Sequence, residues 1–291
     1  MILISYRLRG TNEKWLPGIA HEGQVARVDS LSVRELLTQG RVALDAVFEQ
    51  ARQQFGAGQD LISEGSVEFG PPVPDPDKII CLGVNYREHA AEANQQLPVA
   101  PMFFAKFRNS LIGPTDTVII PRVSSQIDYE GELCAVIGKT CKEVSEGEAL
   151  AYVAGYTLMN DVSARDVQLQ TSQWMAGKAL DTFAPMGPGI VPASMLGDPQ
   201  NLTLTTRVNG QVVQQDNTDQ MIFSVAQAVS FLSQLMTLEP GDIIATGTPS
   251  GVGFKRTPPL FLKDGDITEV EIEGIGKISN PVRHAKVPAN V

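Results

Sequence analysis

The chain has 291 residues, of which 43% are hydrophobic and 19% charged, and its formal net charge at pH 7 is −10. This composition is typical of a globular protein, and the acidic excess argues against nucleic acid or an anionic membrane as the main partner. No apolar run approaches the ~20 residues of a transmembrane helix, and the first residues lack the apolar core of a signal peptide. The three cysteines form no CxxC pair, which favours a reducing compartment, so we expect a cytoplasmic protein.

The first 70 residues are predicted to form a small N-terminal α/β domain. Residues 2–8 and 24–28 have the composition of strands. We expect these two strands to pair across the loop that contains Pro17 and Gly18, since proline and glycine together favour turns.

Two helices and a linker are predicted to follow. The spacing of Ser32 and Glu35 is that of a capping box, which begins a short helix that ends at Gly40. Apolar residues at helical spacing predict a second helix over residues 42–55. Proline has no backbone N–H and a fixed φ, so four prolines within residues 71–77 predict a stiff linker and a domain boundary.

Residues 78–291 are predicted to form the larger, β-rich domain. One helix is expected over residues 224–235, and Asn209-Gly210 is a hairpin signal. Strands outnumber helices and do not alternate with them, which indicates an α+β fold with a mixed or antiparallel sheet. The predicted strands cover residues 78–82, 117–120, 132–137, 154–159, 202–208, 242–246 and 268–272.

Three acidic residues mark the most informative stretch. Glu130 and Glu132 are two apart, so on a strand both carboxylates point to one face, and Glu132 leads into an unbroken apolar run. Buried carboxylates need a positive partner, and a hard divalent cation with Asp161 as third oxygen ligand would supply it. The alternative is a solvated strand edge, where Glu-x-Glu is common.

A histidine and two lysines are further candidates for chemistry. His89 and Glu92 are three apart at the start of a predicted helix, where the carboxylate can orient the imidazole as a base. Lys178, near a Gly/Pro-rich loop, could stabilise developing negative charge, and Lys106 could steer an anion. Each of these residues could equally be a surface residue. The loop 246–253 offers backbone donors and hydroxyls suited to a carboxylate.

In combination, these motifs resemble the fumarylacetoacetate hydrolase family, in particular its short acylpyruvase-like and fumarylpyruvate hydrolase-like branch. The resemblance runs from residue 78 to residue 282, about 70% of the chain. It implies a mixed β-roll like the family's C-terminal domain, a variable N-terminal appendage and a homodimer. The matching segments, in family order, are GVNYREHAAE, FFAKFRNSLIGP, IDYEGELCAVIG, GYTLMNDVSARDVQ, GKALDTFAPMGP, RVNGQVVQQDNTDQMIF, LEPGDIIATGTPSGVG and GIGKISNPV.

The resemblance also implies roles for ten residues, and the chain matches the family pattern at each. Three carboxylates correspond to the ligands of a divalent metal, usually Mg²⁺ and sometimes Mn²⁺ or Ca²⁺. A dyad activates water, a lysine stabilises an oxyanion or enolate, and four residues bind the substrate. In that order, they are Glu130, Glu132 and Asp161; His89 and Glu92; Lys178; and Lys106, Arg165, Gln168 and Thr248.

The function that the resemblance implies is hydrolysis of a carbon–carbon bond in a 2,4-dioxo acid of the acylpyruvate or fumarylpyruvate type, through a metal-stabilised pyruvate enolate. The alternatives are a decarboxylase or isomerase acting on oxaloacetate or a 2-hydroxymuconate-type acid, a hydrolase of diketo-deoxy sugar acids, and a non-catalytic metal-binding scaffold. The expected partner is a small 2-oxo acid. Four side chains are candidates for its distal pocket, namely Gln95, Phe104, Met175 and Phe254.

Overall fold

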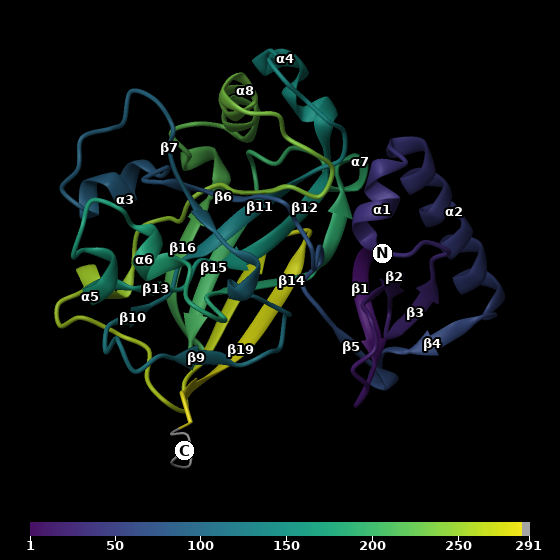
Figure 1. The fold of residues 1–291 in the computed structure, drawn as a ribbon, viewed down its shortest axis with the longest axis horizontal. Coiled ribbons are helices and arrows are strands. Elements are labelled where there is room, and N and C mark those ends of the chain that lie inside the picture. Colours follow the sequence, from purple (N-terminus) through teal and green to yellow (C-terminus); the bar gives the residue numbers. More distant parts are fainter. Residues whose placement is uncertain (287–291) are drawn as a thin grey trace.

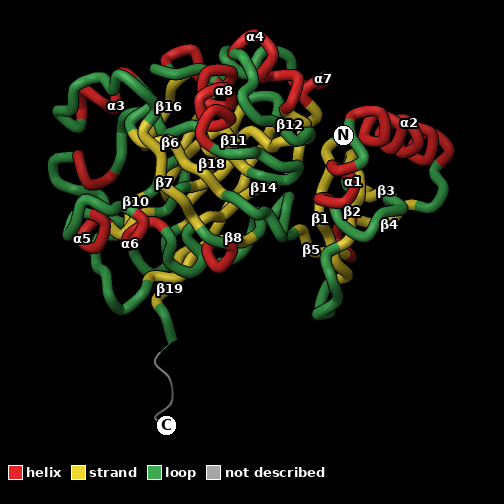
Figure 2. The backbone as a smooth tube through the Cα atoms, turned by 45° about the horizontal axis from the view of Figure 1, so that its top comes forward, coloured by secondary structure: helices red, strands yellow, loops and turns green. Residues whose placement is uncertain are grey.

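The computed structural model describes residues 1–286 and confirms the predicted β-rich α+β class (Figure 1). Strands form the interior and helices lie around them (Figure 2). The largest sheet runs in the order β4-β3-β2-β1-β14-β12-β11-β17-β6-β7, with β5 beside β1 and β8 beside β14. A five-stranded sheet has the order β16-β15-β18-β19-β9, and β10 pairs with β13.

The centre of the large sheet is β11 (Gly131–Ile137), which lies antiparallel between β12 (Val153–Asn160) and β17 (Ile243–Ala245). Every residue of β11 is buried because each face of the strand packs on a different cluster. Alternate side chains of a strand point to opposite faces, so the apolar run is continuous rather than alternating. Beyond β12 lies β14 (Ala184–Pro192), and beyond β17 lie β6 (Ile79–Gly83) and β7 (Met102–Lys106).

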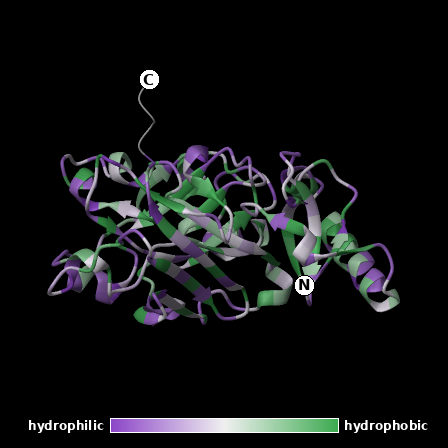
Figure 3. Ribbon diagram, turned by 90° about the horizontal axis from the view of Figure 1, so that it is seen from below, coloured by the Kyte–Doolittle hydropathy of each residue, from purple (hydrophilic) through white to green (hydrophobic). Residues whose placement is uncertain are grey.

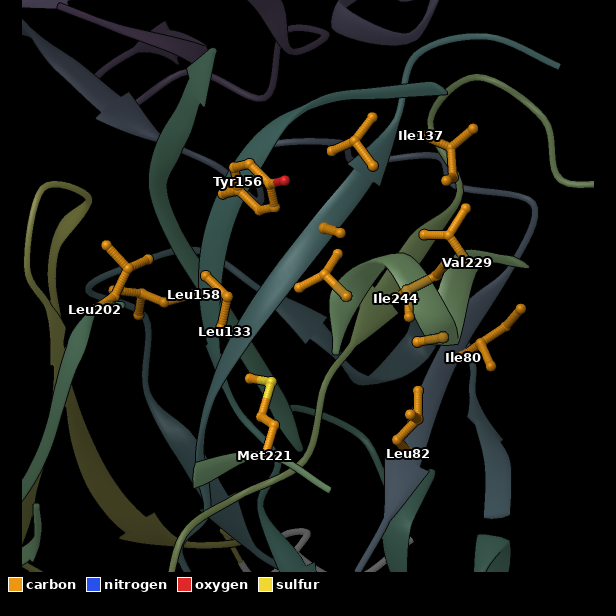
Figure 4. Close-up of a cluster of buried hydrophobic side chains, with 14 of the residues drawn as sticks. Ile80, Leu82, Leu133, Ile137, Tyr156, Leu158, Leu202, Met221, Val229 and Ile244 are labelled. Carbon is orange, nitrogen blue, oxygen red and sulfur yellow. The ribbon is translucent and has the colours of Figure 1, made fainter. Parts of the chain in front are cut away.

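One of these clusters fills the space between β11, its neighbours and α8 (Val225–Leu235). Leu133 and Ile137 of β11, Leu158 of β12 and Val229 of α8 belong to it (Figure 4). The helix begins as predicted, because the Ser224 side chain accepts from the backbone of the third helical residue in a complete capping box.

The five-stranded sheet contributes apolar side chains to the same cluster. A Cβ on Gly131 would lie 2.3 Å from Oγ1 of Thr206, so glycine permits the close approach of the two sheets. The predicted hairpin is confirmed, with Asn209 and Gly210 at φ +51° and +79° as a type I′ turn requires. The strands are β16 (Gln211–Asn217), β15 (Thr203–Val208), β18 (Ile267–Ile272), β19 (Gly276–His284) and β9 (Val118–Ile120).

In the N-terminal part, the predicted pairing across a loop is wrong. Residues 16–21 form strand β2, which lies between the two predicted strands and pairs with both. Glycine at position 18 is typical of a turn. A Cβ there would lie 2.8 Å from the Tyr6 ring, so glycine instead permits close packing within the sheet. The strands are β1 (Ile2–Leu8), β2 (Leu16–His21), β3 (Gln24–Arg27), β4 (Leu61–Ser63) and β5 (Val67–Phe69).

Both predicted N-terminal helices are present, as α1 (Val33–Thr38) and α2 (Arg41–Ala57). Ser32 caps α1 through the backbone N–H of Glu35, whereas the Glu35 carboxylate accepts from Ser30 and the Leu31 N–H, so the capping box is incomplete. The hydropathy colouring of Figure 3 shows hydrophilic and hydrophobic residues alternating on the helix at the outer edge of this part.

The N-terminal strands continue the large sheet, because β1 pairs with β14 at Leu3 and Ile190. Val73, within the proline-rich segment, is fully buried in the cluster that also holds Leu3 and Val136. The segment therefore packs against the body of the protein along part of its length, and a domain boundary at residues 71–77 stays a prediction.

Short elements complete the fold within residues 1–286. The remaining helices are α3 (Arg87–Glu92), α4 (Glu146–Ala149), α5 (Arg165–Gln168), α6 (Met175–Lys178) and α7 (Ala193–Leu196). The remaining strands are β8 (Leu111–Ile112), β10 (Ile127–Asp128) and β13 (Ser163–Ala164). Single 3₁₀ turns cover Glu64–Ser66, Arg108–Ser110, Leu150–Tyr152, Thr218–Gln220 and Gly253–Lys255.

Candidate metal and substrate site

The three predicted metal ligands meet where β11 begins and β12 ends. The strands are antiparallel with Gly131 opposite Asn160, so Glu130 and Glu132 flank the same point that Asp161 reaches from the other strand. One carboxylate oxygen from each residue lies within 4.8 Å of the others. The backbone fixes this arrangement, since the Asp161 N–H donates to the Glu130 carbonyl at 2.7 Å.

Two lysines contact this acidic cluster, here defined as Glu130, Glu132 and Asp161. Lys178 Nζ lies 2.6 Å from Glu130 Oε2 and 2.9 Å from Asp161 Oδ2. Lys106 Nζ lies 2.5 Å from Asp161 Oδ1, so that lysine belongs to the charge network beneath the site. All five side chains are buried, which strengthens their electrostatic interactions.

Arg165 links the acidic cluster to a fourth carboxylate, which sequence reasoning missed. Its guanidinium donates to Glu130 Oε1 at 2.5 Å, to Asp128 Oδ2 at 2.9 Å and to Gln168 Oε1 at 2.9 Å. Asp128 is fully buried and also accepts from the backbone N–H of Gly253 at 2.7 Å. Its position two residues before Glu130, on the same face of an extended segment, was the available signal.

The charges of this buried network do not balance among its described members. Four carboxylates face the two lysines and Arg165, which leaves one negative charge without a partner. That charge falls at Glu132, whose carboxylate accepts from the Gly247 N–H at 2.9 Å and has no ion pair among residues 1–286. A divalent cation fits this donor set, because Mg²⁺ and Ca²⁺ prefer carboxylate oxygens.

The pKa values of the two glutamates diverge accordingly. Burial, followed by the charges of Asp161 and Glu130, raises the pKa of Glu132 well above its usual range. Burial also acts to raise the pKa of Glu130, but the adjacent Lys178 and Arg165 outweigh it and lower that pKa to about 2. The folded protein therefore favours the ionised form of Glu130, whereas it disfavours the ionised form of Glu132 unless a further cation lies nearby.

The predicted dyad lies on α3, beside the acidic cluster. His89 Nδ1 and Glu92 Oε2 are 3.3 Å apart, and the other Glu92 oxygen accepts from the Gly251 N–H at 3.0 Å. Asn85 holds the turn before the helix by donating to the carbonyls of Thr246 at 2.7 Å and Phe223 at 2.9 Å. The His89 imidazole lines the same cavity as the two glutamates.

One loop, residues 247–254, contacts three carboxylates in and beside the site. Its backbone N–H groups reach Glu132 from Gly247, Glu92 from Gly251 and Asp128 from Gly253. Thr248 donates to the Gly131 carbonyl at 2.9 Å. The sequence predicted a carboxylate-holding role for this loop, and the structure shows that it holds carboxylates of the protein itself.

The site encloses a cavity that most of the predicted residues line. Three of the ten are not among the lining residues, namely Glu92, Lys106 and Asp161. Glu92 and Asp161 pair with the lining residues His89 and Lys178, and Lys106 pairs with Asp161. Three of the four distal-pocket candidates line the cavity, and Met175 does not. Trp174, which sequence reasoning missed, lines it instead. The predicted residues that line it are His89, Glu130, Glu132, Arg165, Gln168, Lys178, Thr248, Gln95, Phe104 and Phe254.

The chain is similar to known proteins over most of its length. Residues 78–283 match the profile described as fumarylacetoacetate (FAA) hydrolase, C-terminal. The mitochondrial oxaloacetate tautomerase Fahd2a of Rattus norvegicus is 45% identical over 249 residues, covering 85% of this chain and 78% of the relative. No helix within residues 1–286 is long and apolar enough to span a bilayer.

Two solved structures cover nearly the whole chain. Maleylpyruvate hydrolase from Sphingobium sp. SYK-6, in complex with manganese(II) and pyruvate, superposes with a TM-score of 0.81 at 29% identity, over 98% of this chain and all of that one. The 2-hydroxyhepta-2,4-diene-1,7-dioate isomerase from Mycobacterium marinum superposes with a TM-score of 0.77 at 32% identity, over 99% and 100%. The similar proteins thus include hydrolase, isomerase and tautomerase.

Proposed function

Because the chain belongs to the fumarylacetoacetate hydrolase family, we propose that it is a divalent-metal-dependent enzyme that interconverts the keto and enol forms of a small 2-oxo acid. Oxaloacetate is the proposed substrate. The observation that carries the proposal is the buried acidic cluster with one uncompensated negative charge, next to Lys178 and the His89–Glu92 dyad. The similarity to an oxaloacetate tautomerase over 85% of the chain supports this reaction over hydrolysis, which the sequence had favoured.

The residues divide the work of an enolisation. Glu130, Glu132 and Asp161 would hold the cation, which supplies electrostatic stabilisation of enolate charge when bound. His89, oriented through Nδ1 by Glu92, would take a proton from C3 of the keto acid and return it in the reverse direction. Lys178 Nζ, fixed by two carboxylates, would donate to the 2-oxo oxygen as it gains negative charge.

Hydrolysis of a 2,4-dioxo acid is the second candidate, and one feature favours it. Enolisation needs a single proton shuttle, whereas the dyad of His89 and Glu92 is also suited to deprotonating water. Water would add to the distal carbonyl, the C3–C4 bond would break, and pyruvate and a carboxylic acid would result. The similarity to maleylpyruvate hydrolase supports this alternative.

The finer properties are part of the same proposal. Mg²⁺ is the proposed physiological ion, a homodimer the proposed assembly, and the cytoplasm the proposed location. The chain retains all ten residues that the family resemblance marks as functional, which argues for an enzyme rather than a non-catalytic scaffold.

A spectroscopic assay tests the proposal. The decay of enol-oxaloacetate is followed by its ultraviolet absorbance, with Mg²⁺ alone, with protein and Mg²⁺, and after addition of EDTA. We expect protein-dependent acceleration that EDTA abolishes, with no matching release of pyruvate. Pyruvate release from an acylpyruvate without tautomerase activity would support hydrolysis instead, and no acceleration of either reaction would refute an enzymatic role on these substrates.

A further inference from the structure

The cavity is lined by both ionic and apolar residues. The ionic residues include Glu130, Glu132 and Lys178. The lining also carries apolar and aromatic side chains, which favour a substrate's non-reacting part and not its charged end. These are Leu82, Val84, Phe104, Leu169, Trp174 and Phe254.

Trp174 and Lys178 both lie against the aromatic ring of Phe104. It precedes Lys178 by four residues at the start of α6, so both side chains lie on one face of that turn. The rings of Trp174 and Phe104 meet edge to face with centroids 5.9 Å apart. The Lys178 ammonium lies 5.1 Å from the centre of the same Phe104 ring.

Two glycines hold the tryptophan in this position. A Cβ on Gly83 would lie 2.5 Å from Cζ3 of Trp174, so the indole rests directly on the backbone of β6. A Cβ on Gly177 would lie 2.5 Å from the backbone nitrogen of Gln168, so α6 is pressed against α5. Neither glycine has a positive φ. Both therefore serve close approach rather than a turn, and the indole cannot retreat toward β6.

The space inside the cavity is small. It measures about 60 Å³, so a bulky distal group would meet the side chains that line it. We infer that Trp174, backed by Phe104 and Gly83, is the size-selecting residue of the site, restricting substrates to 2-oxo acids with a short distal group, as in a four-carbon acid. This assignment rests on the proposed function for the 2-oxo acid end, and it excludes aryl and long-chain substrates.

The test uses Trp174→Ala with two ligands that share the 2-oxo acid end, oxaloacetate and phenylpyruvate, both of which enolise. We expect the ratio of kcat/KM for phenylpyruvate to that for oxaloacetate to rise roughly 10- to 100-fold, the range for a change in one apolar pocket contact. Trp174→Phe should give a smaller rise in the same direction. Trp15→Ala is the matched control, because Trp15 is the other tryptophan and stacks on Arg7 in the N-terminal part.

Calorimetry separates this inference from the proposed function. Titration of phenylpyruvate and of oxalate, which has no distal group, into Mn²⁺-loaded protein reports binding without turnover. Tighter phenylpyruvate binding by Trp174→Ala, with the oxalate Kd unchanged, supports the size filter even if no tautomerase activity exists. The filter is overturned if wild-type protein binds phenylpyruvate as well as the variant does. If Trp174→Ala does not fold, the same comparison with Trp174→Phe decides.

Discussion

Replacement of Glu132 by glutamine tests two effects of its charge, one on metal binding and one on the stability of the metal-free protein. Glutamine keeps the shape of the side chain and can still accept from the Gly247 N–H. It removes the one carboxylate of the acidic cluster that lacks an ion pair among the described residues. The variant should therefore bind a divalent metal weakly, yet be the more stable protein when no metal is present.

The size of the metal effect follows from linkage. A metal at 100 times its Kd stabilises the folded state by about 2.7 kcal/mol, and 1 kcal/mol corresponds to about 2–4 °C for a chain of roughly this size. Wild-type protein should thus gain about 5–10 °C in Tm. If loss of the Glu132 charge weakens binding about 100-fold, the same metal concentration gives about 0.4 kcal/mol, or roughly 1 °C.

The metal-free effect has the opposite sign. Burial, Asp161 and Glu130 raise the folded-state pKa of Glu132, so the folded protein binds this proton more tightly than the unfolded chain does. Metal-free stability is therefore lost as the pH rises from the unfolded carboxyl's pKa through the raised value. Glu132→Gln removes that loss, so at pH 8 the metal-free variant should melt above metal-free wild type.

Thermal melts of both proteins, each with EDTA and with Mn²⁺, measure the two effects together. We expect the order of Tm to invert, with the variant higher in EDTA and wild type higher in Mn²⁺. Asp219→Asn is the control, because it neutralises an exposed carboxylate outside the site. Its Tm should equal that of wild type both in EDTA and in Mn²⁺. An equal Mn²⁺ shift in wild type and Glu132→Gln would refute the assignment of Glu132 as a ligand.

Three further predictions concern the dyad, the loop and the ion pairs. His89→Ala should lower kcat by about 10²–10⁴-fold while the Mn²⁺-induced rise in Tm is kept; activity near wild type would exclude His89 as the base. Gly251 has φ +99°, and a Cβ there would lie 2.3 Å from a backbone carbonyl oxygen. Gly251→Ala should therefore lower Tm and displace the backbone N–H that donates to Glu92. An unchanged kcat would show that the loop does not position the dyad. The lowered pKa of Glu130, about 2 against a usual 4.5, contributes stability above pH 4.5 that is lost as the pH falls toward 2. Between pH 4.5 and 2, the Tm of Glu130→Gln should therefore fall less with pH than the Tm of wild type. Equal falls in Tm for the two proteins would contradict the ion pairs.

Local sequence patterns predicted much of the fold and the centre of the site. The buried strand after Glu132, the hairpin at Asn209-Gly210 and the helix capped by Ser224 were all predicted. Each depends on residues close together in the chain, such as a capping residue or an apolar run. The convergence of Glu130, Glu132 and Asp161 follows from one antiparallel strand pair, which is itself a local feature.

The missed features depend on contacts between distant residues. Pro17 and Gly18 signal a turn, but packing against Tyr6 places them in a strand. The contact between Gly251 and Glu92 joins residues 159 apart. Trp174 enters the cavity because β6 has a glycine opposite it. The hydrophobic periodicity of a sequence does not predict such long-range contacts, so they are seen only in the folded structure.

The most direct test is diffraction from crystals soaked in Mn²⁺, with data collected to locate the metal by its anomalous signal. We predict one strong peak among the acidic cluster, with oxygens of Glu130, Glu132 and Asp161 at roughly 2.0–2.6 Å, the range for oxygen ligands of hard divalent cations. A peak elsewhere, or no peak while Glu130 and Asp161 remain paired only with lysine and arginine, would contradict the metal site and the proposed chemistry.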